Sequence, residues 1–291
     1  MRPPRFELSR PSSVAEALRE AGATDDGMFY SGGTELLLAL KLRVIHTEKL
    51  IDLKRIPGLD EIAPVGGEFI AVGARCTHSQ ISQDALVQRT LPSLAQLCSN
   101  VANVRVRNAG TIGGNLCFGE PHADPPTLLA TLGARLCLSS DSGERAVMAD
   151  DFILDEFETV REPHELLTHI IVPIPDGPVT YRRFRHGERP AVNVGMLWSL
   201  DASRRTICSA RVRVGALGPR PQRLERVESA LCGSEVTDAI RVIDAALQVD
   251  LDDLDVTDDR HGSAEYKRHL AGVLLRRNIA EASAECGELR R

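Results

Sequence analysis

The segment Asn108-Ala-Gly-Thr-Ile-Gly-Gly-Asn115 carries the strongest structural signal in this chain. Its glycines allow the backbone to approach a ligand closely and to adopt positive φ, so that successive N–H groups can converge on an anion. The hydroxyl of Thr111 and the amide of Asn115 add hydrogen-bond donors. The segment therefore predicts a loop that binds phosphate groups.

A second glycine loop, Ser31-Gly-Gly-Thr-Glu35, follows a short strand expected over Met28–Ser31. One Gly-Gly pair is weak evidence, because most such pairs are ordinary turns. Two loops that combine glycines with a threonine are more specific. Together they suit a cofactor with a pyrophosphate better than they suit a single phosphate.

Composition narrows the class of protein. The chain has 291 residues, of which 43% are hydrophobic, and a net charge of −6. This length is enough for two or three subdomains, and the acidic balance argues against nucleic-acid binding. The N-terminus has no apolar segment of a secretory signal, and no run approaches the ~18 apolar residues of a membrane-spanning helix. We therefore expect a soluble, cytoplasmic protein without membrane insertion.

Three patterns that resemble metal or disulfide sites do not meet the requirements of such sites. The seven cysteines include no Cys-x-x-Cys, which argues against a zinc ribbon, an iron–sulfur cluster or a disulfide framework. His164 and His169 are five residues apart, so on a helix they diverge by about 140°. The acidic stretch Asp250–Asp259 lacks the glycine and terminal glutamate of a calcium loop, and we interpret it as a solvated linker. We expect no metal site in this chain.

Periodicity and breakers divide the chain at the proline-rich segment Pro173–Pro178. Before it, we expect strands over 28–31, 50–53, 69–73 and 134–138, and helices over 13–20, 34–43, 91–102 and 126–132. After it, we expect strands over 179–185, 193–201 and 207–215, and helices over 222–231, 236–247 and 263–285. The first part thus begins as a βαβ-like lobe, and the last part reads as an antiparallel sheet followed by helices.

Longer strings around the two loops resemble a known family. These strings are Ser31–Arg43, Leu50–Ile62, Val106–Cys117 and His122–Pro126. Together they resemble the FAD-binding medium subunit of the xanthine dehydrogenase family of molybdenum hydroxylases, and in particular the flavoprotein subunit of carbon monoxide dehydrogenase and its bacterial relatives. The resemblance covers nearly the whole chain and is strongest over residues 25–130.

The resemblance implies an α+β fold in three parts. A two-lobed FAD-binding domain of the PCMH/VAO-like type would comprise an N-terminal α/β lobe over 1–55 and a second α/β lobe over 56–174. A C-terminal flavoprotein domain over 178–291 would pack a three-stranded antiparallel sheet against helices. FAD would lie between the first two lobes, with its ring facing the third part.

The resemblance also implies the residues that hold FAD. They are Ser31, Gly32, Gly33, Thr34, Glu35 and Leu36 of the first loop, Gly110, Thr111, Ile112, Gly113, Gly114 and Asn115 of the second, and Asp124, Leu167 and Arg185. The backbone N–H groups of the first loop would wrap the diphosphate, and Asp124 would contact sugar hydroxyls. Leu167 would pack near the flavin ring. Arg185 would either stabilise the reduced flavin or lie on the surface of its strand.

The implied function is electron transfer, with no catalytic residue on this chain. A large partner would hold a molybdopterin-bound molybdenum, and a small partner with two [2Fe–2S] clusters would deliver electrons to FAD for passage to an external acceptor. The expected assembly is a dimer of heterotrimers. Two alternatives stay open: a self-contained FAD-dependent oxidoreductase, and a scaffold subunit that has lost FAD.

Overall fold

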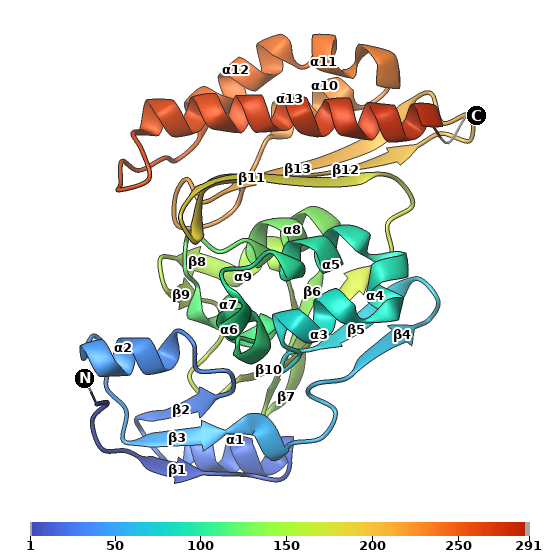
Figure 1. Ribbon diagram of the computed structural model, residues 1–291. Helices are drawn as coiled ribbons and strands as arrows, with labels where there is room; N and C mark the ends of the chain where they lie inside the picture. The colour runs from blue at the N-terminus through green and yellow to red at the C-terminus, as the bar shows by residue number, and fades with distance from the viewer. Residues whose placement is uncertain (1, 289–291) are drawn as a thin grey trace. The chain divides into compact units, whose positions relative to one another are not determined.

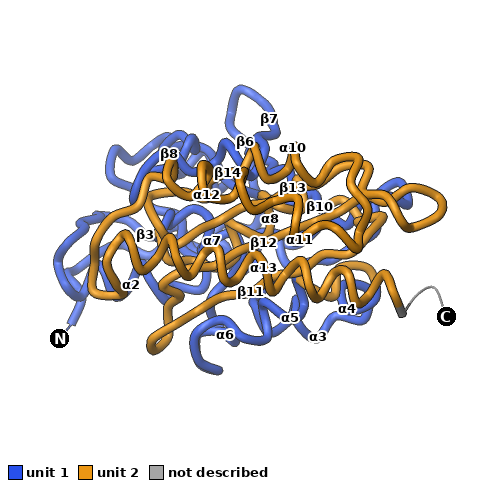
Figure 2. The backbone as a smooth tube through the Cα atoms, turned by 90° about the horizontal axis from the view of Figure 1, so that it is seen from above, with its two compact units in different colours: residues 1–89, 94–120, 134–172 blue, residues 90–93, 121–133, 173–291 orange. Residues whose placement is uncertain are grey.

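The computed structural model describes residues 2–288. The chain forms two compact units, which Figure 2 distinguishes by colour. Unit 1 comprises residues 1–89, 94–120 and 134–172, and unit 2 comprises residues 90–93, 121–133 and 173–291. The last segment of unit 2 thus begins at the proline-rich stretch. The expected division between two lobes near residue 55 stays a prediction.

Unit 1 begins with a small parallel sheet (Figure 1). Its strands lie in the order β1 (Glu7–Ser9), β3 (Lys49–Asp52) and β2 (Gly27–Tyr30), and its helices are α1 (Val14–Gly22) and α2 (Leu36–Leu42). The Ser13 side chain caps α1 by accepting the Glu16 N–H. Strand β2, helix α2 and strand β3 form a parallel βαβ unit, which confirms the predicted character of this segment.

The rest of unit 1 is built around a second sheet. Its strands lie in the order β4 (Ile62–Val65), β5 (Phe69–Gly73), β10 (Leu166–Pro173), β6 (Arg135–Ser140) and β7 (Gly143–Met148). The intervening helices are η1 (Leu53–Arg55), α3 (His78–Gln83), α4 (Ala85–Thr90), α5 (Pro92–Ser99), α6 (Val104–Ala109), α7 (Ile112–Phe118) and α9 (Ala149–Phe152), with a small hairpin of β8 (Ile153–Asp155) and β9 (Glu158–Thr159). The predicted helix over 91–102 ends at Ser99, and Asn103 then caps α6 by accepting the N–H groups of Arg105 and Val106.

Unit 2 contains an antiparallel sheet. Its strands lie in the order β11 (Val179–His186), β12 (Arg189–Leu200), β13 (Ile207–Gly215) and β14 (Gln222–Arg223). The prediction of three strands was wrong, because Arg223 and Gln222 pair with Arg213 and Val214 of β13. These two residues were assigned to the following helix. That helix, α10 (Glu225–Leu231), begins after the strand pairing ends.

Helices cover both faces of this sheet (Figure 1). They are α8 (Pro125–Leu132), α10, η2 (Val236–Asp238), α11 (Ala239–Val242), α12 (Asp244–Asp253) and α13 (Ala264–Glu288). Helix α13 packs on β11 and β12, and α8 packs on the opposite face. Gly215 allows α8 to come close, because a Cβ at this position would lie 2.0 Å from Thr127 Oγ1. Trp198 is fully buried in the core of this unit.

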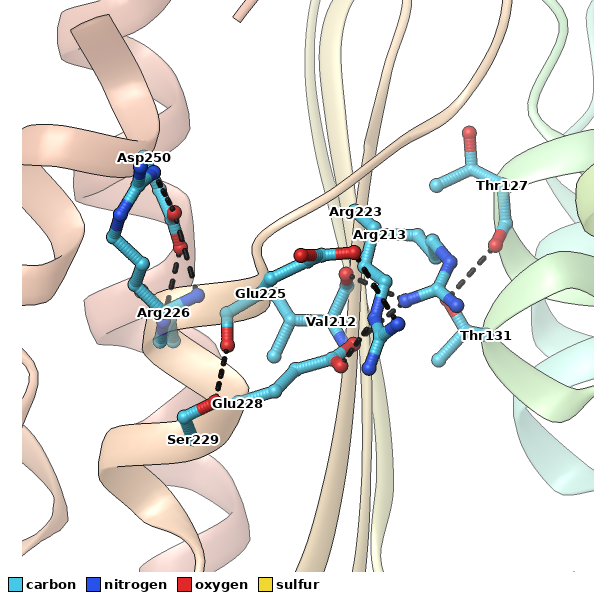
Figure 3. A network of polar contacts seen from close by, with 11 residues as sticks. Thr127, Thr131, Val212, Arg213, Arg223, Glu225, Arg226, Glu228, Ser229 and Asp250 are labelled. Carbon is cyan, nitrogen blue, oxygen red and sulfur yellow. Dashed lines mark hydrogen bonds and ion pairs between the residues drawn. The ribbon is translucent and has the colours of Figure 1, made fainter. Parts of the chain in front are cut away.

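The acidic stretch 250–259 is not a solvated linker, which corrects our interpretation. Asp250 lies in α12 and is 5% exposed. Its carboxylate accepts the Val227 N–H at 2.9 Å. It also pairs with Arg226 at 3.2 Å (Figure 3). A buried carboxylate is tolerated where hydrogen-bond donors pair with it. The donors to Asp250 come from Arg226 and Val227 in the first turn of α10.

Within the described residues, no helix is long and apolar enough to span a membrane.

Candidate cofactor site

The first glycine loop joins β2 to α2 in unit 1. Gly33 has φ 68°, a conformation that favours glycine, and a Cβ there would lie 2.4 Å from the Tyr30 ring. Within residues 2–288, the backbone N–H groups of Gly32, Gly33 and Thr34 have no protein acceptor. Because unpaired backbone donors cost free energy unless water or a ligand satisfies them, this loop offers a row of N–H groups to an anion.

The second glycine segment is a junction between two helices. Gly110 ends α6, and the side chain of Thr111 caps α7 by accepting the Gly114 N–H at 3.1 Å. The N–H groups of Ile112 and Gly113 donate to Cys76 and Ala74 of the neighbouring chain segment, at 3.0 and 2.8 Å. These N–H groups are therefore used inside the protein. Gly114 is exposed, but its own N–H is bonded to Thr111, so a ligand-binding role for the second segment stays a prediction.

The two glycine segments touch each other through their backbones. A Cβ on Gly32 would lie 2.1 Å from the carbonyl oxygen of Ala109, and a Cβ on Gly110 would lie 3.2 Å from Thr34 Oγ1. Real Cβ contacts are not as short as the first of these, so Gly32 is required for the approach. The residues that sequence analysis placed in one site, 31–36 and 110–115, are thus brought together in unit 1.

Two buried polar atoms near this contact indicate a polar ligand. Ser31 Oγ and Asn115 Oδ1 are shielded from solvent and have no hydrogen-bond partner among the described residues. Buried polar groups in native proteins are normally paired. With the open N–H groups of the first loop, these atoms fit a cofactor that carries phosphate oxygens and hydroxyl groups.

His78 supports the second segment and was missed by sequence analysis. Its backbone N–H donates to the Gly110 carbonyl at 3.2 Å, and its side chain is 2% exposed. Burial, followed by the charge of Arg107, lowers the pKa of His78 to about 4. Its position at the first residue of α3, directly after the capping residue Thr77, is the signal that could have placed it beside the loop.

The buried imidazole predicts an acid-sensitive fold. The unfolded chain binds a proton at His78 near pH 6.5, whereas the folded chain does so only near pH 4. The free energy of unfolding is therefore unaffected by His78 above pH 6.5, and protonation of the unfolded chain lowers it by about 3 kcal/mol as the pH drops to 4. We expect a His78→Leu variant to lose this part of the pH dependence, measured as denaturation midpoints across that range. Identical pH slopes for native chain and variant would contradict the assignment.

Asp124 lies in unit 2, directly before α8. It is 5% exposed; its Oδ1 accepts the Tyr181 hydroxyl at 2.6 Å, and its Oδ2 pairs with Arg183. Burial raises the pKa of Asp124, and the Arg183 guanidinium and Tyr181 hydroxyl oppose that rise. The carboxylate thus already has two protein partners. A contact of Asp124 with the cofactor's sugar stays a prediction.

Arg183 is the charged partner that sequence analysis did not identify. Arg183 lies two residues after Tyr181 in β11, and residues two apart in a strand share a face. Sequence analysis chose Arg185 instead, but the strand pairing shifts between Phe184 and Arg185, and the Arg185 side chain is exposed. Leu167 lies in β10 opposite Leu138 and is 3% exposed. The flavin roles of Arg185 and Leu167 stay predictions.

Among the described residues, no group of three or more His, Cys, Asp or Glu side chains is arranged to hold a metal ion. The site consists instead of two glycine segments in backbone contact, open N–H groups and orphaned polar oxygens. This arrangement defines a chain that binds a phosphate-bearing cofactor.

Comparison with known proteins gives the family. Residues 4–175 match the FAD binding domain in molybdopterin dehydrogenase, and residues 179–282 match the CO dehydrogenase flavoprotein C-terminal domain. The chain belongs to the family of FAD-binding subunits of molybdopterin dehydrogenases, and it is a subunit of an FAD-dependent oxidoreductase. The predicted family, α+β fold class and FAD cofactor are confirmed.

Relatives match the chain over nearly its full length. The carbon monoxide dehydrogenase medium chain of Hydrogenophaga pseudoflava is 33% identical over 98% of this chain and 100% of its own. The nicotine 6-hydroxylase medium subunit of Paenarthrobacter nicotinovorans is 30% identical over 98% of this chain and 99% of its own. Carbon monoxide dehydrogenase from Hydrogenophaga pseudoflava lacking the Mo-pyranopterin moiety is a solved structure with a TM-score of 0.91 and 31% identity, over 98% of this chain and 100% of that chain.

Proposed function

We propose that this chain is the FAD-carrying electron-transfer subunit of a molybdenum hydroxylase of the carbon monoxide dehydrogenase type. The observation that carries the proposal is the backbone contact between the two glycine segments, beside the open N–H groups of Gly32, Gly33 and Thr34. When bound, FAD supplies the redox chemistry, accepting electrons from the [2Fe–2S] clusters of a small partner and passing them to an external acceptor.

The chain's own residues bind and orient the cofactor. The N–H groups of the first loop would donate to the diphosphate oxygens, in charge-assisted hydrogen bonds that are stronger than those between neutral groups. The unpaired oxygens Ser31 Oγ and Asn115 Oδ1 would accept hydrogen bonds from hydroxyl groups of the cofactor. Thr34 Oγ1, beside Gly110, would add one more donor. These contacts place the cofactor; they transfer no proton.

The partners and the assembly are part of the proposal. Several relatives are named as medium chains or subunits of dehydrogenases and hydroxylases, which supports a multi-subunit complex. We propose a large molybdopterin subunit, a small [2Fe–2S] subunit, a dimer of heterotrimers and a cytoplasmic location. The substrate would then bind to the large partner, and this chain would never contact it.

Anaerobic reduction of the flavin tests the proposed transfer of electrons from the substrate, through the partner subunits, to FAD. Candidate substrates such as an aldehyde, an N-heterocycle or carbon monoxide are mixed with the native complex and, separately, with the FAD-loaded isolated chain. We expect at least one substrate to bleach the flavin absorbance in the complex and none to bleach it in the isolated chain. Dithionite, which needs no partner, should bleach both. Bleaching of the isolated chain by a substrate would favour the self-contained oxidoreductase instead.

A further inference from the structure

Two free thiols lie on the surface of unit 2, beside the start of β13. Cys208 is the second residue of β13, and Cys232 directly follows α10; both residues are exposed, and we call them the exposed pair. We propose that the exposed pair is a modification site, at which a small disulfide such as oxidised glutathione converts the two thiols into a reversible intrachain disulfide. This proposal is independent of the FAD function.

Backbone contacts place the segment after α10 antiparallel to the start of β13. Thr206 and Glu235 form an antiparallel bridge. The Ile207 N–H donates to the Ser234 carbonyl at 2.9 Å, and the Gly233 N–H donates to the Ile207 carbonyl at 2.7 Å. The residues at 233 and 234 therefore both face the single residue at 207, as in a β-bulge.

The next pair in this register is Cys208 and Cys232. The Cys232 thiol donates to the backbone carbonyl of Cys208, with sulfur and oxygen 3.0 Å apart. Opposed residues of an antiparallel pair have Cα atoms about 4.5–5.5 Å apart, and disulfides join Cα atoms separated by about 4.4–6.8 Å. The spacing of the backbone therefore permits a disulfide after rotation of the two side chains.

A second irregularity of β13 presents Cys208 to solvent. In the pairing with β12, Ser199 faces Ser209 and Leu200 faces Ile207, so Cys208 has no opposite residue there. Cys208 is exposed, whereas the preceding Ile207 is fully buried. A small disulfide in solution can therefore reach the thiol while its neighbour stays in the core.

The other five cysteines are less accessible and less reactive. Cys76, Cys98 and Cys286 are buried, and Cys117 and Cys137 are half-buried. Burial raises the pKa of the Cys76 thiol to about 12 and also raises the pKa of Cys117 and Cys137. Because the thiolate is the form that attacks a disulfide, a raised pKa slows the reaction. We therefore expect the oxidant to select the exposed pair.

The reaction is thiol–disulfide exchange in two steps. One thiolate of the exposed pair attacks a sulfur of the small disulfide, so that a mixed disulfide forms and one small thiol leaves. The other thiolate then attacks the protein sulfur of the mixed disulfide, and the second small thiol leaves. The two cysteines lose two electrons and two protons, and the small disulfide gains them. A dithiol reductant reverses the reaction.

The product would fix the C-terminal end of α10 to β13. The closed segment, residues 208–232, contains β14 and α10. A disulfide that closes a loop restricts the unfolded chain and so favours the folded state. We therefore expect unit 2 to unfold at a higher denaturant concentration when the exposed pair is oxidised.

Peptide mapping of the native complex tests the proposal. The complex is treated with oxidised glutathione, its remaining thiols are alkylated, and it is digested with trypsin without reduction. We expect peptides 206–211 and 227–241, which carry the exposed pair, to be joined, with a mass two hydrogens below the sum of the separate peptides. Dithiothreitol should separate them. Trp198 fluorescence should show a higher denaturation midpoint for the oxidised protein.

Single variants separate the two steps. In a Cys208→Ser variant, Cys232 should retain one glutathione, because no second thiol completes the exchange, and the shift in the denaturation midpoint should disappear. The matched control is Cys137→Ser, which removes a half-buried thiol from β6. This control should form the same joined peptides as the native chain.

Three results would overturn the proposal. The first is glutathione retained on both cysteines of the native chain without a link between the two peptides. The second is recovery of both peptides unmodified after the treatment. The third is linkage of Cys232 to one of the other five cysteines in preference to Cys208.

Discussion

Replacement of Gly32 by alanine should strongly weaken the binding of FAD. The added Cβ would lie 2.1 Å from the Ala109 carbonyl oxygen and 2.9 Å from the Gly110 Cα, so the two glycine segments would have to separate. We expect the separation to remove at least two hydrogen bonds to the diphosphate, each contributing about 1.5 kcal/mol. The affinity for FAD should fall by about 100-fold, measured by quenching of flavin fluorescence.

The matched control is Gly22→Ala. Gly22 lies at the end of α1 in the same unit, and a Cβ there would meet only Asp141 Oδ2, at an ordinary 3.8 Å. This variant should bind FAD as the native chain does. A Gly32→Ala variant that is folded and binds FAD with native affinity would refute the assignment of this contact to the cofactor site.

Replacement of Glu228 by alanine should strongly destabilise unit 2. Its carboxylate is 5% exposed, accepts the Val212 N–H at 2.8 Å, and binds both Arg213 and Arg223 at 2.6 Å (Figure 3). Arg213 is itself buried, with a side chain 7% exposed. Removing one member of a buried ion pair strands the other charge, at a cost of about 3–5 kcal/mol.

Trp198 provides the measurement. It is the one tryptophan in the sequence and lies fully buried in the core of unit 2, so its fluorescence follows unfolding of this unit. Glu225→Ala is the control, because that carboxylate is 73% exposed and pairs with Arg223 at 3.4 Å; it should change stability by less than about 0.5 kcal/mol. A loss below about 1 kcal/mol in Glu228→Ala would show that the network contributes little.

Sequence reasoning predicted the glycine segments and most elements because local rules apply to them. Gly33 needs positive φ, and Ser13 and Thr77 cap the helices that follow them. The second segment was expected to resemble the first, as a loop of open N–H groups. It forms instead a helix junction whose Ile112 and Gly113 N–H groups bind neighbouring carbonyls, a tertiary contact that no local pattern reveals.

Long-range pairing explains the other differences. Asp250 and Asp259 read as solvated acids, but their partners Val227, Arg226 and Lys267 come from other elements. The buried partner of Asp124 is Arg183, although Arg185 has the same spacing along β11. Arg185 is exposed and acts on the pKa of Asp124 only through its charge. Charge and periodicity identify candidates for a site, and only the packing selects among them.

The flavin content of the native chain tests the central claim most directly. The chain is purified with the subunits that accompany it, its flavin is released by denaturation, and the amount is compared with the amount of this chain. The account predicts one FAD for each chain, and a lower FAD content in a Gly32→Ala complex prepared in parallel. A folded native complex without FAD would contradict the account and would favour a scaffold role for this subunit.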